Sequence, residues 1–288
     1  MDILEKFSRY IQMARDAATM PVGTLVTYNA YKYDVLAQIY DKTTTCGLNV
    51  LSRSDRNDKL VVCFKGSVYA QDWFRDFWAW KLDWPYAKTT PDMSKVKIHA
   101  GFKDEYSSVR VPMLGELSDI IARRGKPQHV TVCGHSLGGA LASIAALDIH
   151  ESFDAQNAIT SLYSFASPRA YNDDGAASFM AKMEYALRAS YANDIVPQVP
   201  TINYKHVGKP VHVKQDMSVE FADFNKFALL CTPLDHFVEN YVNAFKYLNN
   251  MPGMADLFSQ NMSDDPADNL KRPTNISQKA EMVLKKSV

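Results

Sequence analysis

The spacing of apolar residues predicts that strands and helices alternate along most of the chain. Between residues 3 and 18 apolar side chains recur every three or four positions, which predicts a helix packed against the body of the protein. Short apolar runs separated by polar turns then predict strands, and they lie at residues 36–40, 48–51 and 60–64. Apolar residues at helical spacing over residues 100–124 predict a long helix.

The alternation continues after this long helix. Further strands are expected at residues 128–133, 161–166 and 187–191, with helices between them at 140–147 and 175–185. Strands and helices in this order indicate an α/β fold with a mostly parallel central sheet and helices on both faces. The apolar density falls from about Pro252, so we expect one domain over residues 1–250 and a C-terminal arm or tail over residues 251–288.

One segment departs from the rest of the chain in its aromatic content. All four tryptophans of the protein lie between residues 69 and 86. Four aromatic side chains at helical spacing would share one face of a helix there, namely Trp73, Phe77, Trp80 and Trp84. Such a stripe is core packing in most proteins. The alternative is a lid over approximately residues 68–88, which covers a binding site and makes transient contact with a lipid interface.

The charge balance excludes several classes of partner. The chain has 32 basic and 32 acidic residues, so nothing in its charge favours nucleic acid or an anionic membrane.

No apolar run is long enough to predict a transmembrane segment. The first residues lack the apolar core of a secretory signal, so we expect a cytoplasmic protein, with export by another route left open. The four cysteines are far apart, which predicts reduced thiols and no metal site.

The candidate nucleophile is Ser136, in the stretch Gly134-His135-Ser136-Leu137-Gly138. This stretch stands between a predicted strand and a predicted helix, which is the context of a nucleophile elbow. Such a turn holds the serine in a strained conformation, and side chains at positions 134 and 138 would collide with neighbouring elements. A turn that only begins the helix is the structural alternative.

A serine nucleophile needs an acid that orients its base, and Asp194 is the first candidate. In α/β-hydrolases the order along the chain is serine, acid, histidine, and the acid follows a later strand. Asp194 comes directly after the strand expected at 187–191. Asp173 and Asp174 also follow a strand, but they begin a predicted helix, where N-terminal capping explains them better.

The candidate base is His236, because it precedes an apolar-periodic helix and therefore lies on a loop. A histidine on a loop can reach a serine that another element carries. The other histidines after Asp194 are His206 and His212, which flank a probable strand pair, where imidazoles are more often structural.

Ester cleavage also needs at least two hydrogen-bond donors for the oxyanion of the tetrahedral intermediate. The backbone N–H of Leu137, next to the nucleophile, is one candidate. Ser67 is the other, since it offers both an N–H and a hydroxyl group at the end of the strand expected at 60–64. An ordinary turn residue is the alternative interpretation of Ser67.

Taken in order, these motifs resemble those of the class 3 (fungal-type) triacylglycerol lipases of the α/β-hydrolase superfamily. The resemblance covers roughly residues 30–250 and includes the stretches at 64–67, 72–73, 96–102, 134–139, 167–169, 193–197 and 235–236. It implies an α/β-hydrolase fold with an amphipathic helical lid. It also implies a triad of Ser136, Asp194 and His236, with an oxyanion hole formed by Ser67 and Leu137.

The resemblance predicts a serine carboxylic ester hydrolase that cleaves acylglycerols or related lipid esters through an acyl-enzyme. Phospholipase A1 and a soluble short-chain esterase are alternatives, and a catalytically silent binding module is an alternative from another class. We expect a lipid ester as substrate and no metal or organic cofactor. The acyl-chain length, the positional selectivity and the oligomeric state stay open at this stage.

Overall fold

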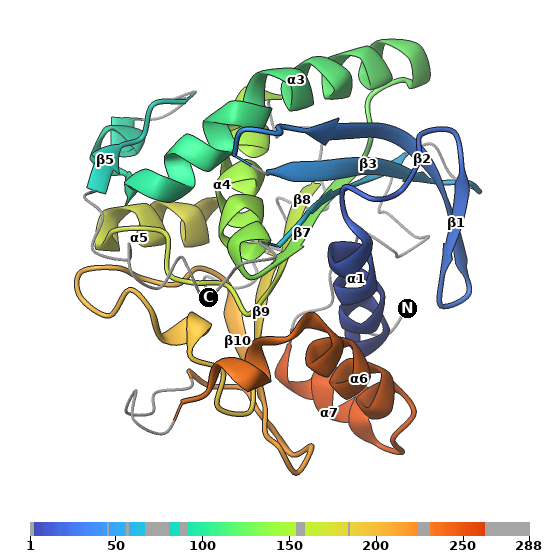
Figure 1. Cartoon of the computed structure of the whole chain (residues 1–288), viewed down its shortest axis with the longest axis vertical. Coiled ribbons are helices and arrows are strands. Elements are labelled where there is room, and N and C mark those ends of the chain that lie inside the picture. The colour runs from blue at the N-terminus through green and yellow to red at the C-terminus, as the bar shows by residue number, and fades with distance from the viewer. Residues whose placement is uncertain are drawn as a thin grey trace, which may run out of the picture.

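The computed structural model describes residues 3–44, 46–55, 58–66, 81–86, 91–153, 159–183, 185–223 and 231–262. This part of the chain forms a nine-stranded sheet in the order β1-β2-β3-β4-β7-β8-β9-β10-β11 (Figure 1). The strands are β1 (Leu25–Tyr28), β2 (Tyr31–Tyr40), β3 (Gly47–Arg53), β4 (Lys59–Phe64), β7 (His129–His135), β8 (Ile159–Phe165), β9 (Tyr185–Tyr191), β10 (Lys209–Val213) and β11 (Val219–Glu220). The helices are α1 (Ile3–Asp16), α3 (Ala100–Arg124), α4 (Leu137–Ser152), α5 (Asp173–Lys182), α6 (Val238–Asn249) and α7 (Met254–Asn261).

Parallel pairing is confined to the middle of the sheet. The pairs β4–β7, β7–β8, β8–β9 and β9–β10 are parallel. The pairs β1–β2, β2–β3, β3–β4 and β10–β11 are antiparallel. Every residue of β4 and β7 is buried, as expected for strands covered on both faces. The mostly parallel sheet that the sequence predicts is therefore correct for the central strands, and the structure adds antiparallel strands at both edges.

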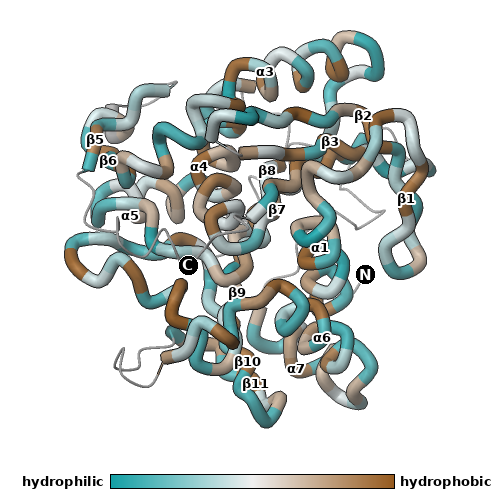
Figure 2. The backbone as a smooth tube through the Cα atoms, in the orientation of Figure 1, coloured by the Kyte–Doolittle hydropathy of each residue, from teal (hydrophilic) through white to brown (hydrophobic). Residues whose placement is uncertain are grey.

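Helices cover both faces of this sheet, as predicted. In Figure 1, α3, α4 and α5 lie on one side of the sheet and α1, α6 and α7 on the other. Figure 2 shows why α4 occupies the inner position: it consists largely of apolar residues, and nearly all of them are buried. α3 lies outside α4, alternates polar and apolar residues, and buries only one side. No helix in the described ranges has the length and apolar character needed to cross a membrane.

The N-terminal helix is more deeply buried than its spacing predicts. α1 lies between the sheet and helices α6 and α7, and even Lys6 and Arg9 are fully buried. The ring of Phe7 contacts aromatic rings from three other elements, at centroid distances of 5.0–5.9 Å; they are Tyr163, Phe165, Phe245 and Phe258. α1 is thus part of the core. α7, in the region expected to be an arm or tail, packs on it, while the division at residue 250 stays a prediction.

The aromatic stripe is shorter than the sequence predicts. Residues Lys81–Asp83 form strand β5, which pairs with β6 (Lys97–His99), so a helix does not extend to Trp84. Trp84 is 1% exposed and packs edge-on against Tyr86 at 4.9 Å. The expectation that Trp84 continues a helical face is therefore wrong, because strand pairing with a distant segment overrides the local spacing. Trp73, Phe77 and Trp80 lie outside the described residues.

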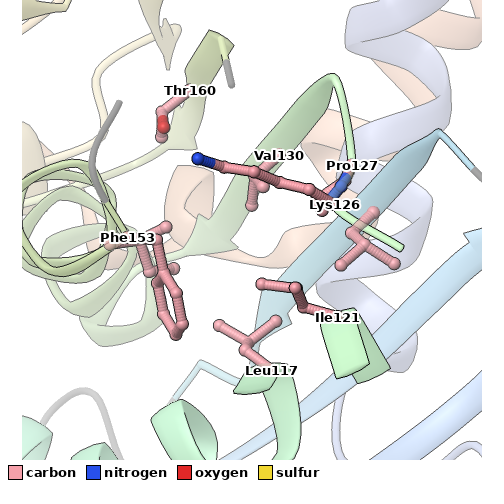
Figure 3. Close-up of a pocket in the computed structure, with 9 residues that line it drawn as sticks. Leu117, Ile121, Lys126, Pro127, Val130, Phe153 and Thr160 are labelled. Carbon is pink, nitrogen blue, oxygen red and sulfur yellow. The ribbon is translucent and has the colours of Figure 1, made fainter. Parts of the chain in front are cut away.

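A small apolar pocket lies at the amino ends of β4, β7 and β8, against the end of α3 (Figure 3). Its lining is apolar apart from the side chains of Lys126 and Thr160. Val130 lines it from the start of β7, whereas Ser136 follows the last residue of that strand. The pocket is therefore at the opposite end of the sheet from the candidate nucleophile.

Candidate active site

Ser136 occupies a strained turn between β7 and α4. Its φ of 59° and ψ of −129° fall outside the regions that residues with a side chain normally adopt. The backbone N–H of Ser136 donates to the carbonyl oxygen of Phe165 at 2.9 Å, so the neighbouring strand β8 holds the turn in place. The side chain is presented at the carboxyl end of the parallel strands, where ligand sites of α/β sheets lie.

Two glycines make this turn possible. A Cβ atom on Gly134 would lie 2.1 Å from the carbonyl oxygen of Gly138, and a Cβ atom on Gly138 would lie 2.6 Å from that of Lys65. Both distances are shorter than any tolerated contact between a Cβ atom and backbone. The strand, the turn and the helix can therefore approach one another only because both positions lack side chains, as the sequence predicts.

The structure brings Ser136, His236 and Asp194 into one hydrogen-bonded chain. The Nε2 atom of His236 lies 2.7 Å from the Oγ atom of Ser136. Its Nδ1 atom lies 3.0 Å from Oδ2 and 3.1 Å from Oδ1 of Asp194. The three residues come from the elbow, from the 3-10 helix Pro233–His236 and from the loop after β9, and all are buried. The imidazole can therefore take a proton from the serine while its other nitrogen donates to the carboxylate.

Two further donors hold the carboxylate of Asp194. The backbone N–H of Val196 donates to Oδ1 at 2.9 Å, and the hydroxyl of Tyr241 in α6 donates to Oδ2 at 2.7 Å. Tyr241 belongs to the apolar-periodic helix that the sequence predicts after His236, and the sequence does not predict this contact. Its position five residues after the histidine is the one signal available, and spacing alone does not reveal where the hydroxyl points.

The loop that carries the histidine is attached to the loop that carries the acid. The backbone N–H of Asn193 donates to Oδ2 of Asp235 at 2.9 Å, and the N–H of Thr232 donates to the carbonyl oxygen of Asn193 at the same distance. The Thr232 hydroxyl in turn accepts from the N–H of Leu234. These bonds fix the position of His236 relative to Asp194 through the backbone as well as through the side chains.

His135, next to the nucleophile, packs against the candidate base. Its ring centroid lies 4.9 Å from that of His236 and 5.4 Å from that of Tyr241. Burial, followed by the charge of His236, holds the pKa of His135 well below its usual range. A neutral imidazole at this position does not repel a positive charge on His236.

The alternative acids and bases lie away from this chain of hydrogen bonds. His206 contacts the carbonyl oxygen of Pro197 at 2.7 Å, and His212 contacts the hydroxyl of Ser190 at 2.9 Å. Asp173 begins α5 and pairs with Lys205 at 3.3 Å. Each of these groups has a structural partner, which agrees with the sequence-based preference for Asp194 and His236.

Of the two candidate donors to the oxyanion, only Leu137 lies among the residues that the structure describes. Leu137 is the first residue of α4, and its backbone N–H is among those that a helix leaves without an intrahelical acceptor. A Cβ atom on Gly66 would lie 3.6 Å from the Cβ atom of Ser136, so the end of β4 passes beside the nucleophile. Ser67, the next residue, lies outside the described residues. The roles of Leu137 and Ser67 stay predictions.

The described ranges contain no group of three or more histidine, cysteine, aspartate or glutamate side chains that could hold a metal ion. All four cysteines are free thiols.

Comparison with known proteins identifies relatives of this chain. The profile of the family Lipase (class 3) matches residues 61–204, which is half of the 288-residue chain. The secreted mono- and diacylglycerol lipase A of Penicillium cyclopium is 28% identical over 202 residues, covering 69% of this chain and 62% of that protein. Phospholipase A1-IIgamma of Arabidopsis thaliana is 29% identical over 182 residues, covering 56% of this chain and 42% of that protein.

Solved structures share the fold. The Rhizomucor miehei lipase in its propeptide complex superposes with a TM-score of 0.67 at 19% identity, covering 81% of this chain and 78% of that one. The α/β-hydrolase fold expected from the sequence is thereby confirmed.

The comparisons correct the expected location. Several relatives are named as secreted proteins, the Penicillium lipase among them, and this contradicts the cytoplasmic location expected from the first residues. The expected location depends only on the composition of the first residues of the sequence. With half of its length matched by one family profile and its fold shared with a fungal lipase, this chain belongs to the class 3 lipase family.

Proposed function

We propose that the protein is a serine carboxylic ester hydrolase, a lipase that cleaves acylglycerols or related lipid esters through an acyl-enzyme. The observation that carries the proposal is the distance of 2.7 Å between Oγ of Ser136 and Nε2 of His236, with Asp194 bound to the other ring nitrogen. A serine hydroxyl is a weak nucleophile at neutral pH unless a positioned base removes its proton.

In the proposed reaction, His236 takes the proton of Ser136 as Oγ attacks the ester carbonyl carbon. The imidazolium then gives this proton to the leaving alcohol, and the serine is left acylated. Water enters, His236 removes one of its protons, and the hydroxide attacks the acyl carbon, so that the carboxylic acid leaves and Ser136 regains its hydrogen. Asp194 stays ionised and holds the imidazole in the tautomer that each step needs.

We further propose that the N–H of Leu137 and the N–H or hydroxyl of Ser67 bind the oxyanion of the two tetrahedral intermediates. The position of Leu137 at the first turn of α4 supports this, since the helix N-terminus favours negative charge. Residues 68–88 would act as the lid, with the aromatic side chains of Trp73, Phe77 and Trp80 in contact with the lipid substrate.

Acylglycerols are the substrate class that the relatives support first, since the Penicillium relative is named a mono- and diacylglycerol lipase. A phospholipase A1 activity is the second candidate, because an Arabidopsis relative of similar identity carries that name. The chain spans 62% of the length of the first relative and 42% of the second, so neither name is transferred to it whole.

The test is hydrolysis of a panel of mono-, di- and triacylglycerols, phosphatidylcholine and short p-nitrophenyl esters. We expect Ser136→Ala to lower kcat on every substrate of the panel by at least about 10⁴-fold, because the nucleophile is lost. Ser143→Ala is the matched control: its buried hydroxyl in α4 bonds the carbonyl oxygen of Ala140 at 2.7 Å and is outside the site. Equal activity of wild type and Ser136→Ala would refute the proposal.

A further inference from the structure

The hydroxyl group of Tyr241 makes two hydrogen bonds. One is with β9, and the other is with Asp194 on the loop after β9, which is called the acid loop below. The backbone N–H of Tyr191 donates to this oxygen at 3.0 Å, and the hydroxyl lies 2.7 Å from Oδ2 of Asp194. Both Tyr241 and Asp194 have an exposed fraction of 0%. Because the oxygen already accepts from Tyr191, its proton is directed at the carboxylate.

The hydroxyl complements the other donors to Asp194. Oδ1 accepts from the N–H of Val196 at 2.9 Å, and Nδ1 of His236 lies within 3.1 Å of both oxygens. With Tyr241, each carboxylate oxygen has a donor of its own besides the shared imidazole. A donor on each oxygen prevents rotation of the carboxylate about its Cβ–Cγ bond, and so fixes the direction in which it holds the imidazole.

Burial shifts the pKa of three titratable side chains around this cluster, Tyr241, His135 and Tyr191. Burial, followed by the charge of Asp194, raises the pKa of Tyr241 well above its usual range, so it stays a donor. His135 in β7 faces the rings of His236 and Tyr241, and burial keeps it neutral. The other groups nearby are Asp235, on the loop of His236, and Tyr191 in β9, whose pKa burial raises.

We propose that Tyr241 is a positioning residue of the active site: its hydroxyl fixes the carboxylate of Asp194 and, through it, the ring of His236. The inference rests on the proposed function, since it assigns Tyr241 to the same hydrogen-bonded chain. Tyr241 does not touch the reacting atoms. It extends the chain from Ser136 to the backbone of β9, so that strand and helix α6 both hold the acid.

The experiment compares Tyr241→Phe with Tyr106→Phe. Tyr106 is the matched control, because its fully buried hydroxyl also donates to a buried carboxylate, that of Asp148 in α4, at 2.8 Å. Both variants keep the ring and lose one hydroxyl. The readouts are kcat and KM on a soluble ester, normalised to the fraction of chains that a fluorophosphonate labels, the pH profile of kcat/KM, and thermal unfolding.

We expect Tyr241→Phe to lower kcat by about tenfold with KM unchanged, because the variant loses one hydrogen bond to a charged group. The acid limb of its pH profile should move to higher pH. With one donor fewer, the carboxylate attracts the imidazolium more strongly, so the base stays protonated to a higher pH. Tyr106→Phe should match wild type in both respects, even where it lowers the unfolding temperature.

A second readout is independent of turnover. In the proton NMR spectrum, the hydrogen between Nδ1 of His236 and Asp194 should shift in Tyr241→Phe and not in Tyr106→Phe. A folded Tyr241→Phe with the kcat, acid limb and resonance of wild type would overturn the inference and leave the proposed function intact. If wild type and Tyr106→Phe hydrolyse no ester, the proposed function fails, and the assignment of Tyr241 to catalysis fails with it.

Discussion

At the scale of single residues, the sequence predicts some of the side chains that form the site and does not predict others. Asp194 and His236 stand on loops that follow a strand and precede a helix, and both positions were predictable from spacing and chain order. Tyr241 was not, because its place on an apolar helix face hides the direction of its hydroxyl. That direction is set by the packing of α6 against the sheet, which is a property of the folded chain.

Glu105 in α3 offers a prediction at this scale. Burial, and then the charge of Asp41, raises the pKa of Glu105 from 4.5 to about 7. The folded protein therefore binds a proton more tightly than the unfolded chain, and stability contributed by that proton is present below pH 4.5 and lost as the pH rises through 7. We expect Glu105→Gln to unfold at a higher temperature than wild type at pH 8, with the difference vanishing towards pH 4.5.

Thermal unfolding followed by circular dichroism across this pH range checks the prediction. Asp119→Asn, which changes an exposed carboxylate on the same helix, is the control and should show no such trend. A Glu105→Gln protein that is less stable than wild type at pH 8 would contradict the proposed cost of the charged carboxylate.

At the scale of elements, an ion pair between a partly exposed arginine and a fully buried aspartate holds α3 to α4. Arg110 donates to Asp148 through Nε at 2.7 Å and through Nη2 at 3.0 Å, and Asp148 has an exposed fraction of 0%. The ring of Tyr86, just after β5, lies 4.7 Å from the same guanidinium. This cluster connects the segment that contains β5 and Tyr86 to both helices, on the face of the sheet that α4 covers.

We expect Arg110→Met to lower the free energy of unfolding by about 3 kcal/mol, because it leaves a buried carboxylate without its cation. The double variant Arg110→Met/Asp148→Leu should recover most of this loss, since no unpaired charge is then buried. Urea denaturation of the three proteins measures both values. Equal stability of wild type and Arg110→Met would show that the pair does not hold the helices.

Most elements were predictable from local spacing, and the exceptions share a cause. The helix over residues 100–124 was expected with its observed bounds, because its buried residues recur at every third or fourth position. The local pattern does not predict β1, and the aromatic spacing predicts a helix that runs through β5. Both strands exist through pairing with a partner, β2 or β6, that a local pattern does not identify.

At the scale of the whole molecule, the site exists only because distant parts of the chain converge. Ser136 and His236 are 100 residues apart in sequence, and Asp194 and Tyr241 are 47 apart. The parallel order of β4, β7, β8 and β9 aligns the carboxyl ends of these strands, where the elbow and the acid loop follow. α1 and α7 cover the opposite face of the sheet from α4, and α1 is as much a part of the core as the central strands.

The central claim is that this convergence makes Ser136 a nucleophile that His236 activates. The most direct measurement is the rate and position of labelling by a fluorophosphonate, followed by mass spectrometry of the digested protein, in wild type and His236→Gln. We predict one phosphonyl group per chain, on the peptide that contains Ser136, and a rate at least about a hundredfold lower in His236→Gln. A wild-type chain that stays unlabelled, or His236→Gln labelled at the wild-type rate, would contradict the account.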